Sequence, residues 1–306
     1  MSDVILQVDG LIKNYKTFTA VNGISFKVPK GKVIGLLGPN GAGKTTTIQV
    51  LLGITLSNGG SISYFGKDFF KNREYCLQRI NYTSSFNNLQ GKITVLENLL
   101  VYSNLYSIKN SRKKIKELVE YFEISSLINQ RYYDLSSGQR TRVNLIKALI
   151  NDPMLILMDE PTASLDPDIA DKLLSLIENL RKTKNTSILY TSHDMEEVTR
   201  ICDEVIFLDK GKIIAQDSPL GLTKRISKAQ VRLTFDGENK ILEKYFKKEK
   251  LKFKFQTKNI VTIDTKEEKV PKLIFSLSKL GIWITDIEVK KPTLEDFFLQ
   301  IARNIK

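Results

Sequence analysis

Cysteine, histidine and long apolar runs are scarce in this chain of 306 residues, which has two cysteines and one histidine. Cys76 and Cys202 provide neither a disulfide framework nor the spacing of a metal site. No apolar run approaches the roughly 18–20 residues that a helix needs to span a bilayer. The first residues lack the basic and apolar regions of a signal peptide. We therefore expect a cytoplasmic protein.

Positive charge exceeds negative charge, with 47 Lys and Arg against 34 Asp and Glu. Most of the excess lies in residues 221–306, which hold 20 basic and 11 acidic residues, whereas residues 1–220 hold 27 and 23. The basic residues of this tail are mostly lysines scattered among acids, and they form no aromatic-interleaved RNA-binding motif. We expect a solvated surface that favours anionic lipid headgroups, and no nucleic-acid partner.

Strand-like and helical patterns follow one another in the order expected of an α/β protein. Apolar strand patterns occupy residues 4–8 and 20–28, and from Leu135 to Leu208 helices alternate with short apolar strands. This alternation is typical of a mostly parallel sheet. Residues from 86 onward carry helical apolar periods, so we expect a helical subdomain at about 86–150.

A second domain is expected near the end of the chain. After Ser218-Pro219, short β-like runs alternate with lysine-rich helical stretches. We expect one domain at residues 1–219 and a small α+β domain, accessory or regulatory, at residues 220–306.

An apolar run at residues 33–37 leads into a glycine-rich turn and then into a helical pattern from Thr45. Strand, glycine loop and helix are the context in which a Walker A loop binds a nucleoside triphosphate. Glycines let backbone N–H groups approach the phosphates, Lys44 adds a positive charge, and hydroxyls are available to Mg²⁺ (Thr45) and to the α-phosphate (Thr46). The alternative is a chance glycine turn with a surface lysine. The residues concerned are Gly38, Pro39, Asn40, Gly41, Ala42, Gly43, Lys44, Thr45 and Thr46.

Two acids, Asp159 and Glu160, end an apolar strand pattern at residues 154–158. Acids are unfavourable at the end of a buried strand unless they have a function. Beside a phosphate loop, Asp159 is a candidate to hold Mg²⁺ through water, and Glu160 is a candidate general base that polarises the attacking water. The alternative is an acidic cap for a helix that begins near Pro161.

Residues 135–139 read Leu-Ser-Ser-Gly-Gln and precede a helical pattern that runs to Ile150. Serine and free N–H groups at a helix start suit an anion, although an ordinary N-cap has the same composition. Twenty positions later comes LILMDEPTASLD. Together with the phosphate loop, these segments closely resemble the ABC-type ATPases over about residues 4–215.

The resemblance implies a P-loop NTPase core of ABC type with an N-terminal antiparallel β arm and a helical subdomain. It also implies a homodimer, because the LSSGQ segment of such proteins contacts ATP held by a second copy. The residues concerned are Ser136, Ser137, Gly138 and Gln139. Asp166, in the loop that crosses the same interface, is expected to contribute, although before Pro167 it could also be only a helix cap.

Three further roles follow from the resemblance. His193 occupies the place of the switch histidine that senses the γ-phosphate and orients the water. Tyr15 lies 23 residues before Gly38, where such proteins stack adenine on an aromatic ring. Ser85 stands where a glutamine usually contacts Mg²⁺ and couples the site to a membrane subunit. Since serine reaches the metal only through a water molecule, we expect altered coupling or turnover.

The tail, which ends with PTLEDFF, is similar to the C-terminal extension of ATPase subunits of drug- and antibiotic-resistance exporters. We therefore expect an ATPase with ATP and Mg²⁺ as cofactors, bound peripherally at the inner face of the membrane through a separately encoded permease. The alternatives are the ATPase of an ABC importer and a soluble ABC ATPase that acts on ribosomes or DNA.

Overall fold

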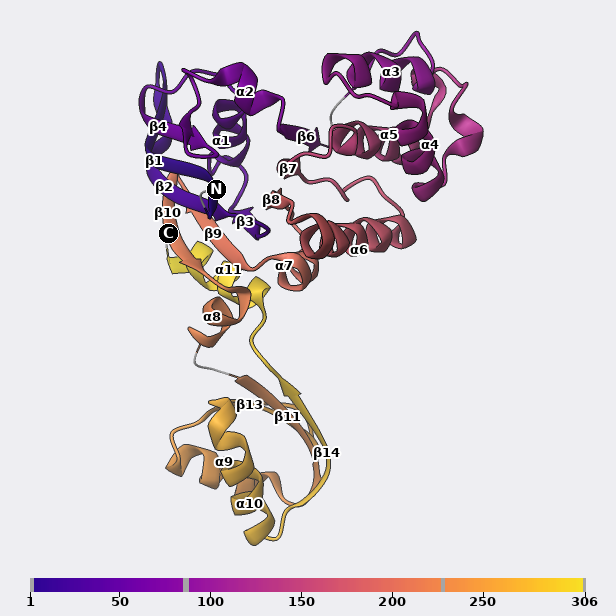
Figure 1. Ribbon diagram of the computed structural model, residues 1–306. Helices are drawn as coiled ribbons and strands as arrows, with labels where there is room; N and C mark the ends of the chain where they lie inside the picture. Colours follow the sequence, from indigo (N-terminus) through magenta and orange to yellow (C-terminus); the bar gives the residue numbers. More distant parts are fainter. Residues whose placement is uncertain (1–2, 85–87, 227–228, 305–306) are drawn as a thin grey trace. The chain divides into compact units, whose positions relative to one another are not determined.

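The computed structural model describes residues 3–84, 88–226 and 229–304 (Figure 1). The chain divides into two units, Met1–Pro219 and Leu220–Lys306. No helix within these described ranges is both long enough and apolar enough to cross a membrane.

The first unit begins with an antiparallel sheet in the order β2-β1-β4-β5. Its strands are β1 (Val4–Tyr15), β2 (Phe18–Pro29), β4 (Gly59–Tyr64) and β5 (Lys67–Asp68). β1 and β2 form a long hairpin, and alternate residues such as Leu6, Val8, Ile24 and Phe26 are buried on one face. This sheet is the antiparallel β arm that the sequence predicted.

The second sheet of this unit has the order β10-β9-β3-β8-β7-β6 and is parallel except at β10. Its strands are β3 (Val33–Leu37), β6 (Ile80–Ser84), β7 (Leu155–Asp159), β8 (Ser187–Thr191), β9 (Glu204–Asp209) and β10 (Lys212–Asp217). Every residue of β3, β7 and β8 is buried. Strands covered on both faces are the reason for the uninterrupted apolar runs in the sequence.

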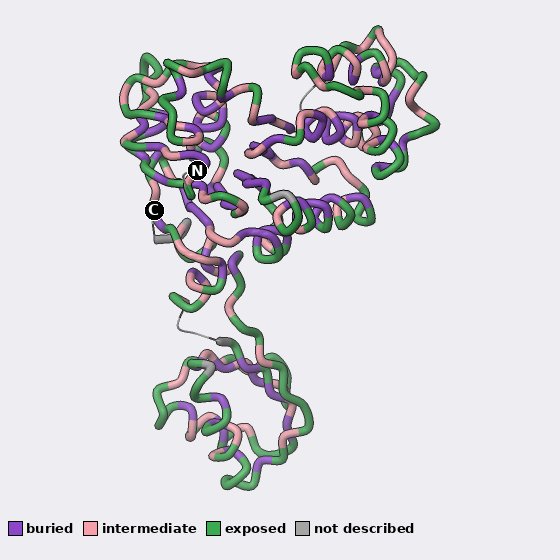
Figure 2. The backbone as a smooth tube through the Cα atoms, in the orientation of Figure 1, coloured by how far each residue is buried: buried purple, intermediate pink, exposed green. Residues whose placement is uncertain are grey.

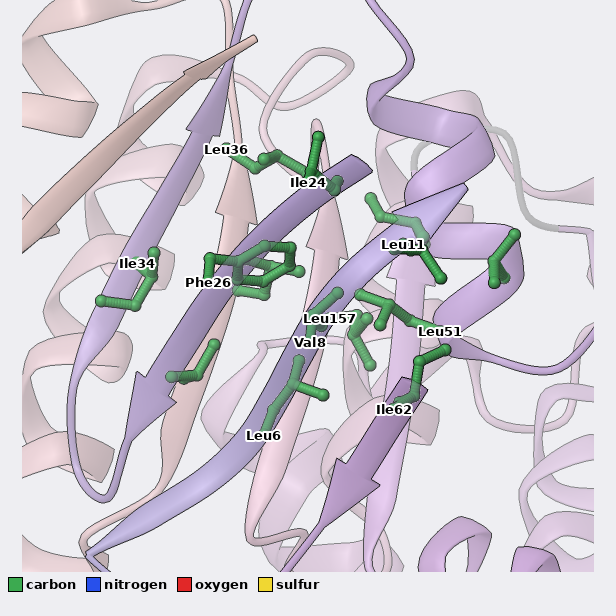
Figure 3. Packing of buried hydrophobic residues seen from close by; sticks show 14 of the residues in the cluster. Leu6, Val8, Leu11, Ile24, Phe26, Ile34, Leu36, Leu51, Ile62 and Leu157 are labelled. Carbon is green, nitrogen blue, oxygen red and sulfur yellow. The ribbon is translucent and has the colours of Figure 1, made fainter. Parts of the chain in front are cut away.

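The two sheets share one hydrophobic core. Leu6, Val8 and Phe26 of the arm pack in the same cluster as Leu36 of β3 and Leu157 of β7 (Figure 3). Burying a side chain of this size contributes roughly 1.5–3 kcal/mol. The arm is thereby fixed to the parallel sheet, and the tip of its hairpin is positioned by the same packing.

The helices of the first unit fall into two groups. The core group is α1 (Lys44–Leu51), α2 (Arg73–Leu77), α6 (Pro167–Lys184) and α7 (Met195–Ile201). The helical subdomain holds α3 (Val95–Leu105), α4 (Ser111–Tyr121) and α5 (Ser137–Leu149), with short 3₁₀ turns at Ser125–Leu127 and Tyr132–Asp134. A capping box between Thr94 and Glu97 starts α3. Buried and exposed residues alternate along α3, whereas α5 is buried or half-buried after its first residue (Figure 2).

The second unit contains a four-stranded antiparallel sheet in the order β12-β13-β11-β14. Its elements are α8 (Pro219–Lys224), β11 (Ala229–Asp236), α9 (Asn239–Lys248), β12 (Lys252–Thr257), β13 (Ile260–Thr265), a 3₁₀ turn at Glu267–Lys269, α10 (Val270–Lys279), β14 (Trp283–Lys290) and α11 (Leu294–Asn304). The order β-α-β-β-α-β is that of a ferredoxin-like motif. Val231 and Leu233 of β11 pack with Phe246 of α9 and Leu277 of α10. The expected small α+β domain is therefore present.

Candidate active site

The loop between β3 and α1 can hold its conformation only with glycine at two positions. Gly38 and Gly43 have φ values of 149° and 105°. A Cβ at Gly38 would lie 2.2 Å from the carbonyl oxygen of Leu208, and one at Gly43 would lie 2.4 Å from that of Ala20. The loop is thus pressed against β9 and β2. It ends at the N-terminus of α1, where no side chain caps the helix and the backbone N–H groups suit an anion.

Lys44, the first residue of α1, is buried inside this loop. Its Nζ donates to the carbonyl oxygen of Gly38 at 2.7 Å and to that of Pro39 at 3.3 Å. Burial lowers the pKa of Lys44, while the charges of Glu160 and Asp159 act in the opposite direction. The ammonium group therefore lies in the electrostatic field of both acids. Thr45 is exposed and Thr46 half-buried in the same first turn.

Asp159 and Glu160 lie at the carboxyl end of β7, and Thr191 at the end of β8 positions both of them. The hydroxyl of Thr191 donates to Oδ1 of Asp159 at 2.6 Å and accepts the backbone N–H of Glu160 at 3.0 Å. The strand register pairs Asp159 with Thr191 on one side and with Ser84 on the other. This edge of a parallel sheet is where ligands of α/β proteins bind.

Glu160 has a backbone φ of 51°, in the left-handed region that residues other than glycine, asparagine and aspartate rarely adopt. Its N–H also donates to the carbonyl oxygen of Thr191 at 3.1 Å. The side chain reaches His193, whose Nε2 lies 2.6 Å from Oε1 of Glu160. The structure thus brings together the candidate base and the only histidine of the sequence.

The donor set around Asp159 fits a magnesium ion that arrives with a nucleotide. The described residues contain no group of three His, Cys, Asp or Glu side chains that could hold a metal by themselves. Mg²⁺ in nucleotide sites instead uses one or two carboxylates, several waters and substrate phosphates. A nearly buried carboxylate at Asp159 and an exposed hydroxyl at Thr45 are suitable partners. Ser85, the third candidate ligand, lies outside the described residues.

The LSSGQ segment forms the exposed start of α5. The side chain of Ser136 accepts the N–H of Gln139 at 3.3 Å, and the Gln139 side chain accepts the N–H of Ser136 at 2.9 Å. Ser136 and Gln139 therefore form a capping box, as the N-cap interpretation predicted. The Ser137 side chain stays exposed, and a Cβ at Gly138 would lie 3.2 Å from the carbonyl oxygen of Ser164. Within the described ranges, no hydrogen bond or ion pair connects residues 136–139 with the phosphate loop.

Asp166 occupies the N-cap position of α6, with Pro167 following, but its side chain makes no capping hydrogen bond. The residue is exposed. Asp166 therefore stands at the cap position that the sequence suggested, but its carboxylate does not cap the helix.

An exposed pair of aromatic rings lies at the tip of the β1–β2 hairpin. Tyr15 and Phe18 stack with ring centroids 5.4 Å apart and an interplanar angle of 25°. They are 39% and 60% exposed, and Nζ of Lys13 lies 5.1 Å from the Tyr15 ring centroid. Sequence reasoning found Tyr15 and missed Phe18, although an aromatic residue in a short polar turn was a usable signal. Two exposed stacked rings provide a flat apolar surface that suits a nucleobase.

Comparison with known proteins places the chain in a family. Residues 21–163 match the family model described as ABC transporter. A Nod factor export ATP-binding protein I of Rhizobium sp. (strain N33) is 34% identical over 308 residues, which cover 99% of this chain and 98% of the relative. The chain belongs to the ABC transporter family, as an ATP-binding subunit. The resemblance stated from the sequence is confirmed.

Other ABC proteins agree with this assignment. A second Nod factor export ATP-binding protein I, from Rhizobium johnstonii, is 32% identical over 304 residues, with 99% of this chain and 96% of the relative covered. A solved ATP-binding subunit of an ABC transporter superposes with a TM-score of 0.68 at 26% identity, over 72% of this chain and 92% of that one. The cbiO1 protein of Clostridium perfringens, part of an ABC transporter complex, gives 0.63 at 28% identity, over 73% and 92%. The ABC ATPase fold is thus confirmed.

Proposed function

We propose that this ABC protein hydrolyses MgATP between two copies of itself and thereby drives a separately encoded membrane permease, in the direction of export. The observation that carries the proposal is the contact between Glu160 and His193 at the sheet edge where Lys44 and Asp159 also lie. A candidate base, a polar partner for it, a metal-binding carboxylate and a phosphate-binding lysine are the components of phosphoryl transfer to water.

In this mechanism the phosphate loop binds the β- and γ-phosphates through its backbone N–H groups and through Lys44. Asp159 and Thr45 would hold Mg²⁺, which would supply positive charge against the charge that develops on the phosphate oxygens. Glu160 accepts a proton from the attacking water through its carboxylate, and His193 holds that carboxylate at 2.6 Å. Thr191 keeps Asp159 and the Glu160 backbone in fixed positions. Tyr15 and Phe18 stack on the adenine.

The dimer explains the exposed start of α5. Ser136 and Gln139 already satisfy each other, so the exposed hydroxyl of Ser137 and the N–H groups of Ser137 and Gly138 are the groups left for a phosphate of the partner copy. Asp166 is exposed and follows Ser164 on the same loop, and the carbonyl oxygen of Ser164 lies close to Gly138. We place both segments at the interface between the copies.

Export and a membrane partner are proposed from the relatives. Proteins named as export ATP-binding proteins match this chain over 99% of its length, including the second unit. A subunit that couples to such a permease works at the cytoplasmic face of the membrane, where ATP is available. The basic second unit is proposed as an accessory or regulatory domain at that face.

Phosphate release from MgATP by the purified protein tests the proposal, with Glu160→Gln as the decisive variant. We expect this variant to bind MgATP, to lose at least about 10²-fold in kcat, and to elute as an ATP-dependent dimer. Wild-type turnover in the Glu160→Gln protein would remove Glu160 as the base. Coexpression with the permease, followed by ATPase assays in proteoliposomes, tests coupling. A cargo gradient formed inward instead of outward would contradict export.

A further inference from the structure

Glu197, a buried residue in the first turn of α7, accepts three hydroxyl groups on a single carboxylate oxygen. Its Oε2 lies 2.7 Å from the hydroxyl of Tyr190, 2.8 Å from Oγ of Ser192 and 3.0 Å from Oγ1 of Thr162. In the described part of the chain these hydroxyls, and no lysine or arginine, contact the carboxylate. A residue that served packing alone at this place would be apolar, because a buried carboxylate requires such compensation.

The directions of these hydrogen bonds are well defined. Ser192 Oγ accepts the backbone N–H of Asp194 at 3.0 Å, so its own hydroxyl hydrogen can point at Glu197. Burial, together with the nearby charge of Glu197, raises the pKa of Tyr190 far above its usual range, so this phenol remains a donor. Hydrogen bonds to an ionised acceptor are roughly twice as strong as those between neutral groups.

The three donors lie on two segments, the one that follows the candidate base and the one that leads to the histidine. Thr162 lies two residues after Glu160, on the segment that continues to Asp166. Ser192 directly precedes His193, and Tyr190 lies on β8 directly before Thr191. One oxygen atom therefore connects the segment after the base with the segment that carries the histidine. The two segments thus share one hydrogen-bond acceptor.

We propose that Glu197 is a positioning residue that sets the contact between Glu160 and His193 and links it, through Thr162, to the segment formed by residues 162–166. This inference rests on the proposed function, because it assigns Glu197 a part in ATP hydrolysis. Asp166 is exposed on the same segment as Thr162. A displacement of that segment by a second copy thus reaches His193 through the Glu197 carboxylate.

The neighbouring Glu196 allows a matched test. Glu196 is exposed, lies on the same helical turn, and loses the same charge when it is changed to glutamine. We expect Glu197→Gln to lower kcat about 10- to 100-fold, by analogy with residues that orient metal ligands through a hydrogen bond. KM for MgATP should change less than about twofold, because the phosphate loop is untouched. Glu196→Gln should hydrolyse ATP like the wild type.

The outcomes separate this inference from the proposed function. A wild-type protein that hydrolyses no ATP overturns both. A wild-type protein that hydrolyses ATP, with Glu197→Gln and Glu196→Gln equal in kcat, overturns only the role of Glu197. An equal loss of nucleotide binding and kcat in soluble Glu197→Gln also overturns it, since that is the result of general structural damage.

Thr162 provides a second test if Glu197→Gln does not fold. Thr162→Val removes one half-buried hydroxyl and keeps the shape of the side chain, while Thr162→Ser keeps the hydroxyl. We expect the valine variant to lose kcat several-fold with unchanged KM, and the serine variant to recover most of that loss. Equal kcat in the two variants contradicts the link through Thr162. In a double variant that folds, Thr162→Val should lower kcat no further than Glu197→Gln does alone.

Discussion

The imidazole of His193 lies within hydrogen-bond distance of the carboxylate of Glu160, 2.6 Å from Nε2 to Oε1. The two residues follow the ends of adjacent parallel strands, β7 and β8, so the pairing of these strands sets their separation. The contact also fixes the direction in which one carboxylate oxygen points. This geometry makes His193 a partner of the base in the proposed reaction.

We expect His193→Gln to lower kcat by about 10²-fold or more while KM for MgATP stays within a few-fold. The reason is that the flexible glutamine amide holds the carboxylate of Glu160 less firmly than the rigid imidazole does, whereas Lys44 and the loop proposed to bind the phosphates are unchanged. Steady-state phosphate release measures both constants. Thr199→Ala, on the exposed side of α7, is the control. A large rise in KM with unchanged kcat would show that His193 only binds nucleotide.

Phe18→Ala is expected to weaken ATP binding. Stacking on an aromatic ring is worth about 1–3 kcal/mol per base, so Kd should rise roughly 5- to 150-fold. Because ring stacking discriminates little between bases, GTP binding should weaken to a similar extent. Titration with a fluorescent ATP analogue measures Kd. Tyr121→Ala removes another exposed aromatic ring, on α4, and an equal loss of affinity in this control would refute the role of Phe18.

Alanine substitutions in the phosphate loop should separate backbone strain from steric clash. Gly41 has a φ of 80° with open space around its Cβ position, whereas a Cβ at Gly38 meets the carbonyl oxygen of Leu208 at 2.2 Å. Gly41→Ala should cost about 1–2 kcal/mol from the left-handed conformation alone. Gly38→Ala should lose nucleotide binding as well, because the loop has to move. Thermal unfolding with and without MgATP distinguishes the two, and equal effects would contradict the clash.

Lys147 on α5 should make stability depend on pH in the alkaline range. Its Nζ donates to Asn81 Oδ1 and to the carbonyl oxygen of Tyr82, both at 3.0 Å, and burial lowers its pKa to about 8. A group whose pKa is lower in the folded state than in the unfolded state binds fewer protons when folded. Its contribution to stability is therefore greatest above the unfolded pKa of 10.5 and is lost as the pH falls towards about 8.

The expected difference in stability between wild type and Lys147→Met grows by at most about 3 kcal/mol between pH 8 and pH 10.5. Hydrogen exchange of the α5 amides at several pH values measures this difference in stability around Lys147. Lys116→Met, which removes a well-exposed lysine of α4, should show no such trend. A difference between wild type and Lys147→Met that stays constant with pH would contradict the lowered pKa.

The parts of the site that lie close together in the sequence were predictable from it. The phosphate loop is one continuous segment whose glycine spacing is visible in the sequence, although the contacts that require Gly38 and Gly43 come from Leu208 and Ala20 on other strands. The end of β7 was recognisable because two acids follow a run of apolar positions. The αβ alternation and the small second unit likewise follow from local periodicity.

Long-range side-chain contacts were not predictable. The Thr162–Glu197 hydrogen bond joins residues 35 positions apart, and Thr191 reaches Asp159 across 32 positions. A threonine in a buried strand and a glutamate in an amphipathic helix are ordinary in sequence, and only the pairing of β7 with β8 brings them to the site. Phe18 had a usable signal as an aromatic residue in a short turn, but its stacking with Tyr15 across the hairpin is visible only in the structure.

The left-handed backbone of Glu160 implies a trade-off between stability and activity. Asparagine tolerates this conformation better than glutamate does, because its short side chain interacts with the local backbone. Random substitution at this position, followed by selection for heat resistance alone, should therefore enrich variants that have greater thermal stability and hydrolyse no ATP. The residue best suited to the turn is not the residue that the proposed reaction requires, and only selection for turnover would retain glutamate.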